Sequence, residues 1–161
     1  MNGNETQMID VGAKDVTQRE AVAEGFIAMK TETIEMVRRS TLPKGNAQET
    51  ARVAAIMAAK STPTLIPLCH PLLISHASCK FEFAQGQNEM GQIRVQTRVR
   101  CAGQTGVEME ALAACAAALL TIYDMTKGVD ETLEITGIRL LEKRGGKSGD
   151  FVRDASLTKH L

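Results

Sequence analysis

The chain has 161 residues, enough for one domain with a substantial core and too few for a second domain of ordinary size. Nineteen basic residues balance nineteen acidic ones, so the chain lacks the overall positive field that nonspecific binding of nucleic acid or membranes needs. With 43% hydrophobic and 24% charged residues, the composition is globular and excludes a disordered or fibrous protein.

The N-terminus and the cysteines indicate the compartment. Residues 1–5 form neither a basic nor an apolar leader, and no apolar run is long enough to span a membrane. Cys69, Cys79, Cys101 and Cys115 show no Cys-x-x-Cys spacing, which is typical of free thiols in a reducing compartment. We therefore expect a soluble, cytoplasmic protein with a single domain over residues 1–161 and mobile tails at about 1–8 and 152–161.

The first half of the chain is expected to form one strand followed by two helices. Loose alternation favours the strand, and apolar residues at helical spacing favour the second helix, which Thr62-Pro63 should end. A short segment, residues 8–11, could join a sheet edge. The expected elements are a strand at 19–29, helices at 31–39 and 47–61, and a turn at 41–46.

The second half should supply most of the sheet. Residues 65–71 hold two prolines and are expected to be an ordered loop. Strands are expected at 72–83, 92–101 and 133–141, a turn at 86–91, a long helix before the last strand and a flexible basic loop at 142–149. Ile93, Val95, Thr97 and Val99 should share one face of their strand. This order favours an α+β sandwich, an antiparallel sheet with helices on one face and the other side open to a subunit contact.

The long helix has ionisable groups at both ends and none in the middle. Residues 111–120 are apolar and mostly small, which predicts a helix buried on all sides. Glu108 and Glu110 precede this stretch, and Asp124 and Lys127 follow it. Carboxylates beside a buried helix must be paired, shifted in pKa or used in chemistry. The alternative is structural, with an Asp124–Lys127 ion pair and glutamates that favour the helix N-terminus.

The basic loop is a candidate anion site. Its three glycines, within residues 145–149, let backbone amides turn toward a ligand, and Lys143, Arg144 and Lys147 supply positive charge. Leu141 stands where a phosphate-binding P-loop requires glycine, which argues against a nucleoside-triphosphatase. A solvated tail loop is the alternative interpretation.

A histidine lies between two prolines in residues 67–71, Pro-Leu-Cys-His-Pro. The prolines restrict the backbone and would hold His70 in one direction, as a general acid or base requires. A structural hydrogen bond is the alternative role. Cys69, His70, His76 and Cys79 are close in sequence, but their spacing matches no common zinc pattern, so no metal site is predicted.

Several long motifs connect these segments. They are Lys44-Gly45, Ala51-Arg52, Met57-Ala-Ala-Lys60, Leu65-Ile-Pro-Leu-Cys-His-Pro-Leu72, Gly103-Gln-Thr-Gly-Val-Glu-Met-Glu-Ala-Leu112, Leu120-Thr-Ile-Tyr-Asp-Met125, Lys127, Arg139-Leu-Leu-Glu-Lys143 and Gly145-Gly-Lys-Ser-Gly149. Over about residues 9–151 the chain closely resembles the cyclic pyranopterin monophosphate synthases, also called molybdenum cofactor biosynthesis protein C. It departs from them at Asn46, where Asp is common, and at Thr126-Lys-Gly128, where Cys-Lys-Ala is more usual.

The resemblance implies a lyase that converts 3′,8-cyclo-7,8-dihydroguanosine 5′-triphosphate into cyclic pyranopterin monophosphate with release of diphosphate. It also implies a ferredoxin-like fold and a homohexamer built as a trimer of dimers. No cofactor is expected, and nothing in the sequence indicates the divalent cation that could accompany diphosphate. Neither nucleic acid nor membrane is an expected partner.

The resemblance also assigns roles to individual residues. Asp124, Lys127 and Lys44 resemble the family's catalytic groups. Clustered lysines should have lowered pKa values, so that one of them can act as a general acid near neutral pH. The residues that resemble its substrate-binding set are Arg19, Lys60, Leu68, Cys69, His70, Glu108, Met109, Glu110, Lys143 and Lys147.

Helix geometry adds one expectation that does not depend on the resemblance. Fourteen residues separate Glu110 from Asp124, and on a continuous helix their backbones lie roughly 21 Å apart at about 1.5 Å per residue. One small substrate cannot easily contact both within a single chain. If both belong to one site, a second copy must bring its Asp124 and Lys127 to the Glu110 of the first.

Two classes of function remain open at this point. An enzyme would turn over the cyclised nucleotide, whereas a binding module that has lost catalysis would bind it without forming product. Asp124 and Lys127 are both present, which favours the enzyme.

Overall fold

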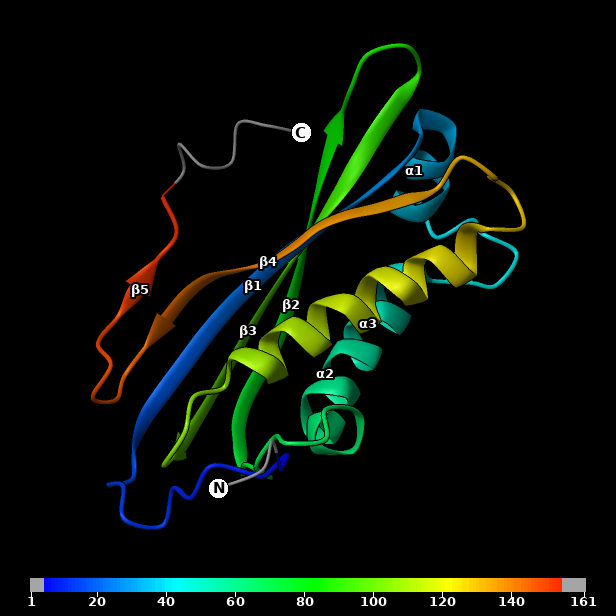
Figure 1. Ribbon diagram of the computed structural model, residues 1–161. Coiled ribbons are helices and arrows are strands. Elements are labelled where there is room, and N and C mark those ends of the chain that lie inside the picture. Colours follow the sequence, from blue (N-terminus) through cyan, green and yellow to red (C-terminus); the bar gives the residue numbers. More distant parts are fainter. Residues whose placement is uncertain (1–4, 155–161) are drawn as a thin grey trace.

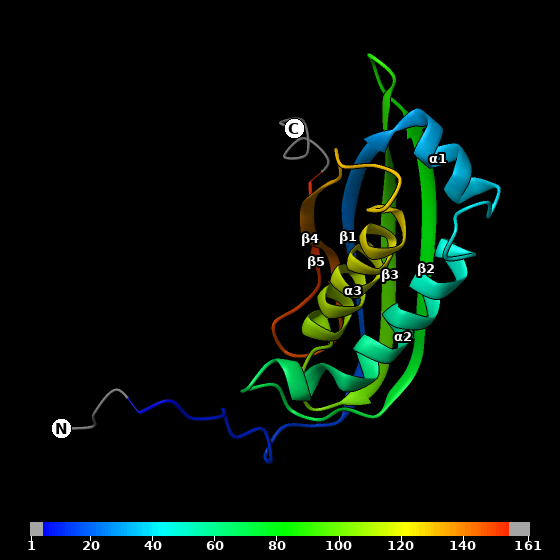
Figure 2. The ribbon, with the colours of Figure 1, turned by 90° about the vertical axis from the view of Figure 1, so that its right-hand side faces the viewer.

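The computed structural model describes residues 5–154 as one antiparallel sheet with helices on one of its faces (Figure 1). The elements are β1 Thr17–Lys30, α1 Thr31–Arg38, α2 Ala47–Leu65, β2 Ile74–Gln85, β3 Met90–Gly103, α3 Glu108–Thr126, β4 Glu134–Arg144 and β5 Phe151–Val152. The strands lie in the order β2-β3-β1-β4-β5, and Figure 2 shows the helices together on one side. The predicted α+β, ferredoxin-like architecture is confirmed.

The core lies between the sheet and the two long helices. Ile93, Val95, Thr97 and Val99 alternate along β3 and are fully buried, which confirms the predicted face. The Thr97 hydroxyl donates a hydrogen bond of 2.8 Å to the backbone carbonyl of Ala111. The sheet therefore holds the first turn of α3 by a polar contact as well as by apolar packing.

Gly25 sets how closely α3 approaches the central strand. A Cβ at this position would lie 2.6 Å from Leu119 Cδ1, 3.0 Å from Ile138 Cγ1 and 3.2 Å from the sulfur of Cys115. Two of these neighbours are on α3 and one is on β4. The missing side chain therefore lets the helix pack against β1 and fixes its height above the sheet.

The second helix is longer than the sequence predicts. It runs to Leu65 and contains Pro63 in its last turn. Proline removes the N–H that would bond to the carbonyl of Ala59, but the Thr62 hydroxyl is 3.3 Å from that oxygen and donates to it. The expected stop at Thr62-Pro63 was therefore wrong. At the other end, the side chain of Asn46 accepts a hydrogen bond from the Glu49 amide at 3.1 Å and caps the helix.

The C-terminal part of the sheet also differs from the prediction. β4 extends through Arg144, and the short strand β5 pairs with it, with Lys143 opposite Phe151. The basic segment 142–149 is therefore a strand end followed by a turn and is not a loop throughout. Residues 8–11 form no strand, so the expected edge pairing was wrong. The expected tails fall largely on residues 1–4 and 155–161, which are outside the described range.

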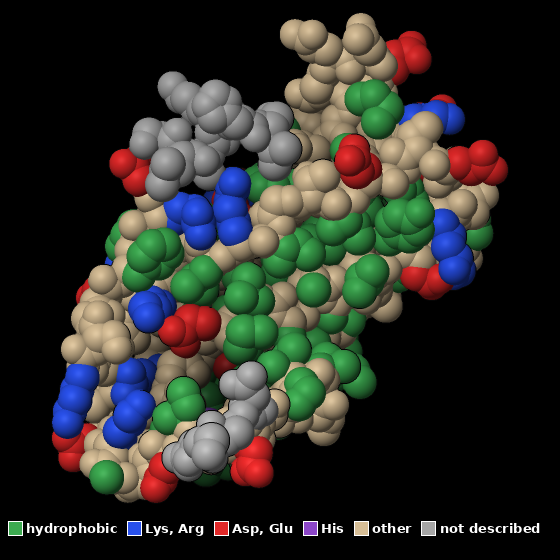
Figure 3. Space-filling view, in the orientation of Figure 1, with side chains coloured by type: hydrophobic (Ala, Val, Ile, Leu, Met, Phe, Trp, Pro, Cys, Tyr) green, Lys and Arg blue, Asp and Glu red, His purple; other side chains and the backbone are tan. Residues whose placement is uncertain are grey.

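The third helix is buried on one side only. Ala111, Cys115, Ala118 and Ile122 face the core and are fully buried, whereas Leu120 is 62% exposed. Figure 3 shows a band of hydrophobic side chains along this helix. The expectation of burial on all sides is therefore wrong for the single chain. The helix is long and apolar enough to cross a membrane, but half of its apolar window is buried within the protein.

The opposite face of the sheet is covered by charged side chains. Glu24 is 3% exposed and lies 2.7 Å from Arg94 Nε and 2.8 Å from Arg139 Nη2. Glu20 pairs with Arg98 and Arg100 in the same way. The long arginine side chains therefore neutralise the carboxylates of β1 on the side away from the helices.

We expect Gly25→Ala to destabilise the protein by about 1–3 kcal/mol, the usual cost of overpacking a core. The added methyl group must displace Leu119 or lift α3 from the strand. Urea unfolding would measure the change. Gly128→Ala is the matched control, because a Cβ there has no neighbour within 4 Å. Equal stabilities for the two variants would contradict the close approach.

Candidate active site

Two adjoining cavities lie at the end of the sheet where β1 and α3 begin. Their volumes are about 420 and 510 Å³. Lys14, Thr105, Gly106 and Glu108 line both, so the cavities share a wall. The first contains most of the basic groups, and the second contains the loop that carries His70.

Arg19 holds the backbone around the first cavity. Its guanidinium donates to the carbonyls of Gly103 at 3.3 Å, Gln104 at 3.4 Å and Gly145 at 3.1 Å. A Cβ on Gly146, whose φ is +86°, would lie 1.6 Å from Arg19 Nη1, so only glycine fits there. Three of the five N–H donors of Arg19 are used in this way. This arginine therefore positions two loops, and two of its donors have no acceptor among residues 5–154 and could bind a ligand.

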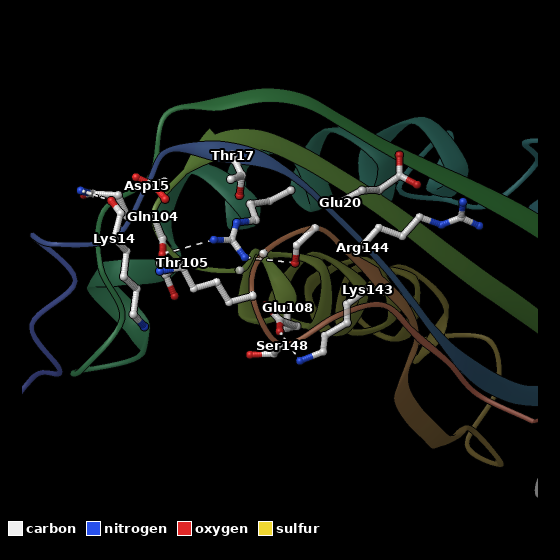
Figure 4. A pocket seen from close by; sticks show the side chains of 15 residues that line it. Lys14, Asp15, Thr17, Glu20, Gln104, Thr105, Glu108, Lys143, Arg144 and Ser148 are labelled. Atoms are coloured by element: carbon white, nitrogen blue, oxygen red, sulfur yellow. Dashed lines mark hydrogen bonds and ion pairs between the residues drawn. The ribbon is translucent and has the colours of Figure 1, made fainter.

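Positive side chains surround the first cavity. Lys143 Nζ lies 3.5 Å from Glu108 Oε1, and Figure 4 shows the two side chains together, with Lys14 on the other side of the cavity. Lys147 is exposed in the glycine turn and lines the same cavity. Lysines and arginines outnumber the carboxylates here. The cavity is therefore suited to an anion with several negative charges.

Lys14 was not among the residues predicted from the sequence. Its backbone carbonyl accepts a hydrogen bond of 2.9 Å from the side chain of Gln104, which also donates to the carbonyl of Gly12 at 3.2 Å. These bonds hold the N-terminal segment across the end of the sheet. The segment has no regular secondary structure, so periodicity gave no signal for its position.

The second cavity contains a buried carboxylate. Glu110 is 1% exposed, and neither of its side-chain oxygens has a hydrogen-bond partner on another described residue. Burial, and then the charge of Glu108, raise the pKa of this carboxyl. Burial and the Glu110 charge also raise the thiol pKa of Cys69 and Cys101. Leu68, His70 and Met109 line the same space, so the predicted binding residues of this region do meet.

A third set of predicted residues lies at the other end of α3. We call Asp124, Lys44 and Lys127 the Asp124 group. Asp124 Oδ2 is 2.7 Å from Lys44 Nζ, and Asp124 Oδ1 is 2.8 Å from Lys127 Nζ. These two lysines lower the pKa of Asp124 to about 2, with Lys127 making the larger contribution. The aspartate in turn raises the pKa of Lys127. The expectation that clustering lowers the lysine pKa is therefore wrong for Lys127 in the single chain, where a carboxylate and not another cation is the nearest charge.

One chain does not bring all the predicted residues together. α3 is continuous from Glu108 to Thr126, so Glu110 and Asp124 stay roughly 21 Å apart along it at about 1.5 Å per residue. Lys44 belongs to the Asp124 group, and Lys60 is exposed on α2 and lines neither cavity. Arg19, Lys143, Lys147, Glu108 and the His70 loop belong to the cavity end.

The structure separates the residues that were weighed as zinc ligands. Cys79 and His76 both belong to β2, but Cys79 is buried in the core and His76 is exposed. Within residues 5–154 no three His, Cys, Asp or Glu side chains are placed to hold a metal ion together. The expectation that the protein uses no cofactor stays a prediction.

Comparison with known proteins decides the family. A model of the MoaC family matches residues 8–146, which include most of the residues that line the two cavities and all three members of the Asp124 group. The chain belongs to the MoaC family. It is therefore an enzyme of the lyase class with a role in molybdenum cofactor biosynthesis.

Curated relatives in the MoaC family are similar over nearly their whole length. The chain is 53% identical to a protein of Chloroflexus aggregans, with 93% of this chain and 89% of the relative covered. It is 51% identical to one of Roseiflexus sp. (strain RS-1), with 92% of each covered, and 50% identical to one of Brucella ovis, with 94% and 91% covered. All three are named cyclic pyranopterin monophosphate synthase.

We expect Glu110→Gln to raise the thermal midpoint at pH 8 and to leave it nearly unchanged at about pH 4. The pKa of Glu110 is raised above its ordinary 4.5 in the folded chain. Its contribution to stability is therefore complete below that value and is lost as the pH rises through the folded pKa. Glutamine has no ionisation cost, so it should be the more stable residue at high pH. A wild-type midpoint that exceeds that of the variant at pH 8 would contradict the unpaired burial.

Proposed function

We propose that the protein converts 3′,8-cyclo-7,8-dihydroguanosine 5′-triphosphate into cyclic pyranopterin monophosphate and releases diphosphate. The names of the relatives support the product. The observation that carries the proposal is the basic cavity around Arg19, Lys143 and Lys147, next to the buried Glu110. It offers separate environments for a polyphosphate and for a polar ring.

The cations would bind the triphosphate. Net charge is zero, so only a local cluster can hold several negative charges. Lys14, Lys143, Lys147 and the two remaining donors of Arg19 supply it. Release of diphosphate needs these charges to stabilise the leaving group. The second cavity, with Glu110, Met109 and His70, would then receive the guanine-derived ring.

The Asp124 group would transfer protons. A carboxyl with a pKa of about 2 is ionised at neutral pH, so Asp124 cannot be the acid. It holds the ammonium groups of Lys44 and Lys127, and these can donate. Near the cations of the basic cavity the pKa of Lys127 would fall, because like charges disfavour the protonated form. Bringing the two groups together would therefore prepare a lysine for acid catalysis.

Each complete site would contain residues from two chains. The length of α3 supports this, since it keeps the two groups apart in one chain. We propose a homohexamer, a trimer of dimers, in which each dimer forms two such sites. We further propose that the protein works in the cytoplasm, where its free thiols would stay reduced.

We expect Asp124→Asn and Lys127→Ala each to lower turnover at least a hundredfold, a typical contribution of positioned acid–base groups. The thermal midpoint should change little, because both side chains are more than half exposed. Pterin and diphosphate formed from the purified cyclic triphosphate would be measured. Asn keeps the shape of Asp124 and removes its charge, so it separates chemistry from packing.

Near wild-type turnover in either variant would contradict the acid–base assignment. Tight binding of the cyclic triphosphate by wild-type protein, with no product, would instead identify a binding module. Loss of the folded state in Asp124→Asn would return the three side chains to a purely structural role.

A further inference from the structure

We infer that Asp130 is a positioning residue that holds the two lysines of the Asp124 group against their aspartate. This inference rests on the proposed role of the Asp124 group in proton transfer, and it names the side chain that sets the geometry of that group. Asp130 lies three residues after Lys127, in the loop between α3 and β4.

Asp130 has a buried carboxylate with hydrogen bonds to both of its oxygens. The residue is 2% exposed. Its Oδ2 atom accepts from the backbone N–H of Lys30 at 2.9 Å and from the hydroxyl of Thr33 at 2.8 Å. Its Oδ1 atom accepts from the backbone N–H of Thr132 at 2.8 Å and from the hydroxyl of the same residue at 2.6 Å. Burial alone would raise the pKa of this carboxyl, but the hydrogen bonds outweigh burial and lower the pKa to about 2.

The two oxygens of Asp130 join segments that are far apart in the sequence. Thr132 belongs to the same loop as Asp130, whereas Lys30 ends β1 and Thr33 lies in the first turn of α1. Figure 1 shows this loop beside α1. A carboxylate near the start of a helix also interacts favourably with the helix dipole. Asp130 therefore fastens the end of α3 to the start of α1.

Lys127 lies on the first of these two segments. It caps the C-terminus of α3. The backbone amides of Val129 and Asp130 both donate to the carbonyl of Thr126, at 2.9 and 3.1 Å. Lys127 is therefore within a tight turn whose far end is Asp130, and fixing that end fixes the turn.

Lys44 is connected to the second segment. It lies in the turn after α1, which is bound to that helix by a hydrogen bond of 3.0 Å from the Thr41 amide to the Met36 carbonyl. The Lys44 ammonium then returns to α3, where it donates to the backbone carbonyl of Asp124 at 2.9 Å and to its carboxylate at 2.7 Å. The contacts thus form a closed ring from α3 through Asp130 and α1 back to α3.

The ion pairs of the Asp124 group cannot hold this geometry by themselves. All three side chains are more than half exposed, and exposed ion pairs contribute little, because water screens them and long side chains lose conformational entropy. Asp130 is a buried charge, so loss of one of its donors leaves a carboxylate oxygen away from water with an unmade hydrogen bond, which is costly. The buried anchor therefore decides where the exposed lysines lie.

The reactivity of Lys127 toward acetic anhydride, measured by mass spectrometry, tests the positioning without substrate. Asp124 raises the pKa of Lys127 above its ordinary 10.5. In Asp130→Asn and in Thr33→Val we expect this pKa to fall toward 10.5, so the labelling rate at pH 8 should rise by roughly twofold or more relative to that of exposed Lys80. Thr33→Val changes no charge, so its effect would report geometry alone.

Thr132→Val is the matched control. It removes a hydroxyl that donates to the same carboxylate, but this hydroxyl belongs to the loop of Asp130 itself and is exposed, so that water can replace it. The link to α1 stays intact in this variant. The labelling rate of Lys127 should therefore equal that of the wild type.

Steady-state kinetics with the cyclic triphosphate separates positioning from a purely structural role. We expect Asp130→Asn to lower kcat about tenfold or more, because a small misplacement of a reacting group is costly. KM should stay unchanged, since the basic cavity at the other end of α3 would bind the phosphates. Thr33→Val should lower kcat in the same direction, and Thr132→Val should not.

An unchanged Lys127 rate in both Asp130→Asn and Thr33→Val, or an equal rise in Thr132→Val, would overturn the inference. A wild-type kcat in a variant whose Lys127 rate has risen would overturn it as well. If the wild-type protein forms no product, the proposed reaction fails, and the labelling alone decides whether Asp130 positions the lysines. If Asp130→Asn loses its helical circular dichroism, Thr33→Val decides by the same measurements.

Discussion

The packing of α3 against β1 is the constraint on which the rest of the structure depends. Gly25 lets the helix lie directly on the central strand, and the Thr97 hydroxyl ties its first turn to β3. A helix held in this way is rigid, so the groups at its two ends keep a fixed separation. Glu110 therefore stays with the basic cavity, and Asp124 stays with Lys44 and Lys127. Chemistry that uses both ends requires a second chain.

The two ends of α3 differ in their charged groups. In the exposed Asp124 group one carboxylate pairs with two lysines, and it raises the pKa of Lys127, so Lys127 stays protonated in a single chain. The cavity end has an excess of cations and one buried carboxylate, Glu110, that has no hydrogen-bond partner on another residue within 5–154. Neither end is suited to catalysis alone. The cations of the cavity end repel one another until a polyphosphate binds, and the carboxylate of Asp124 holds the proton on Lys127. A bound polyphosphate and an approaching lysine would remove both obstacles.

Much of this arrangement could be predicted from the sequence. The alternation in β3 and the apolar run in α3 placed the core, and the motifs named residues that the structure brings together at the two cavities and around Asp124. What failed depended on contacts between distant segments. The Thr62 hydroxyl replaces the bond lost at Pro63, β5 exists only because β4 is beside it, and Lys14 is placed by Gln104. Periodicity carries no information on such contacts. The exposed face of α3 misled the prediction because an apolar helix looks alike whether its own chain or another covers it.

Activity from a mixture of two inactive chains tests the central claim most directly. Asp124→Asn and Glu110→Gln chains would be prepared separately, mixed in equal amounts and shown to exchange subunits by mass spectrometry. If each site takes Glu110 from one chain and Asp124 from another, half of the random pairs are mixed and each contains one intact site. The mixture should then recover roughly a quarter of wild-type turnover. If both variants are inactive alone, exchange is demonstrated and the mixture stays inactive, the two ends of α3 do not act in one shared site.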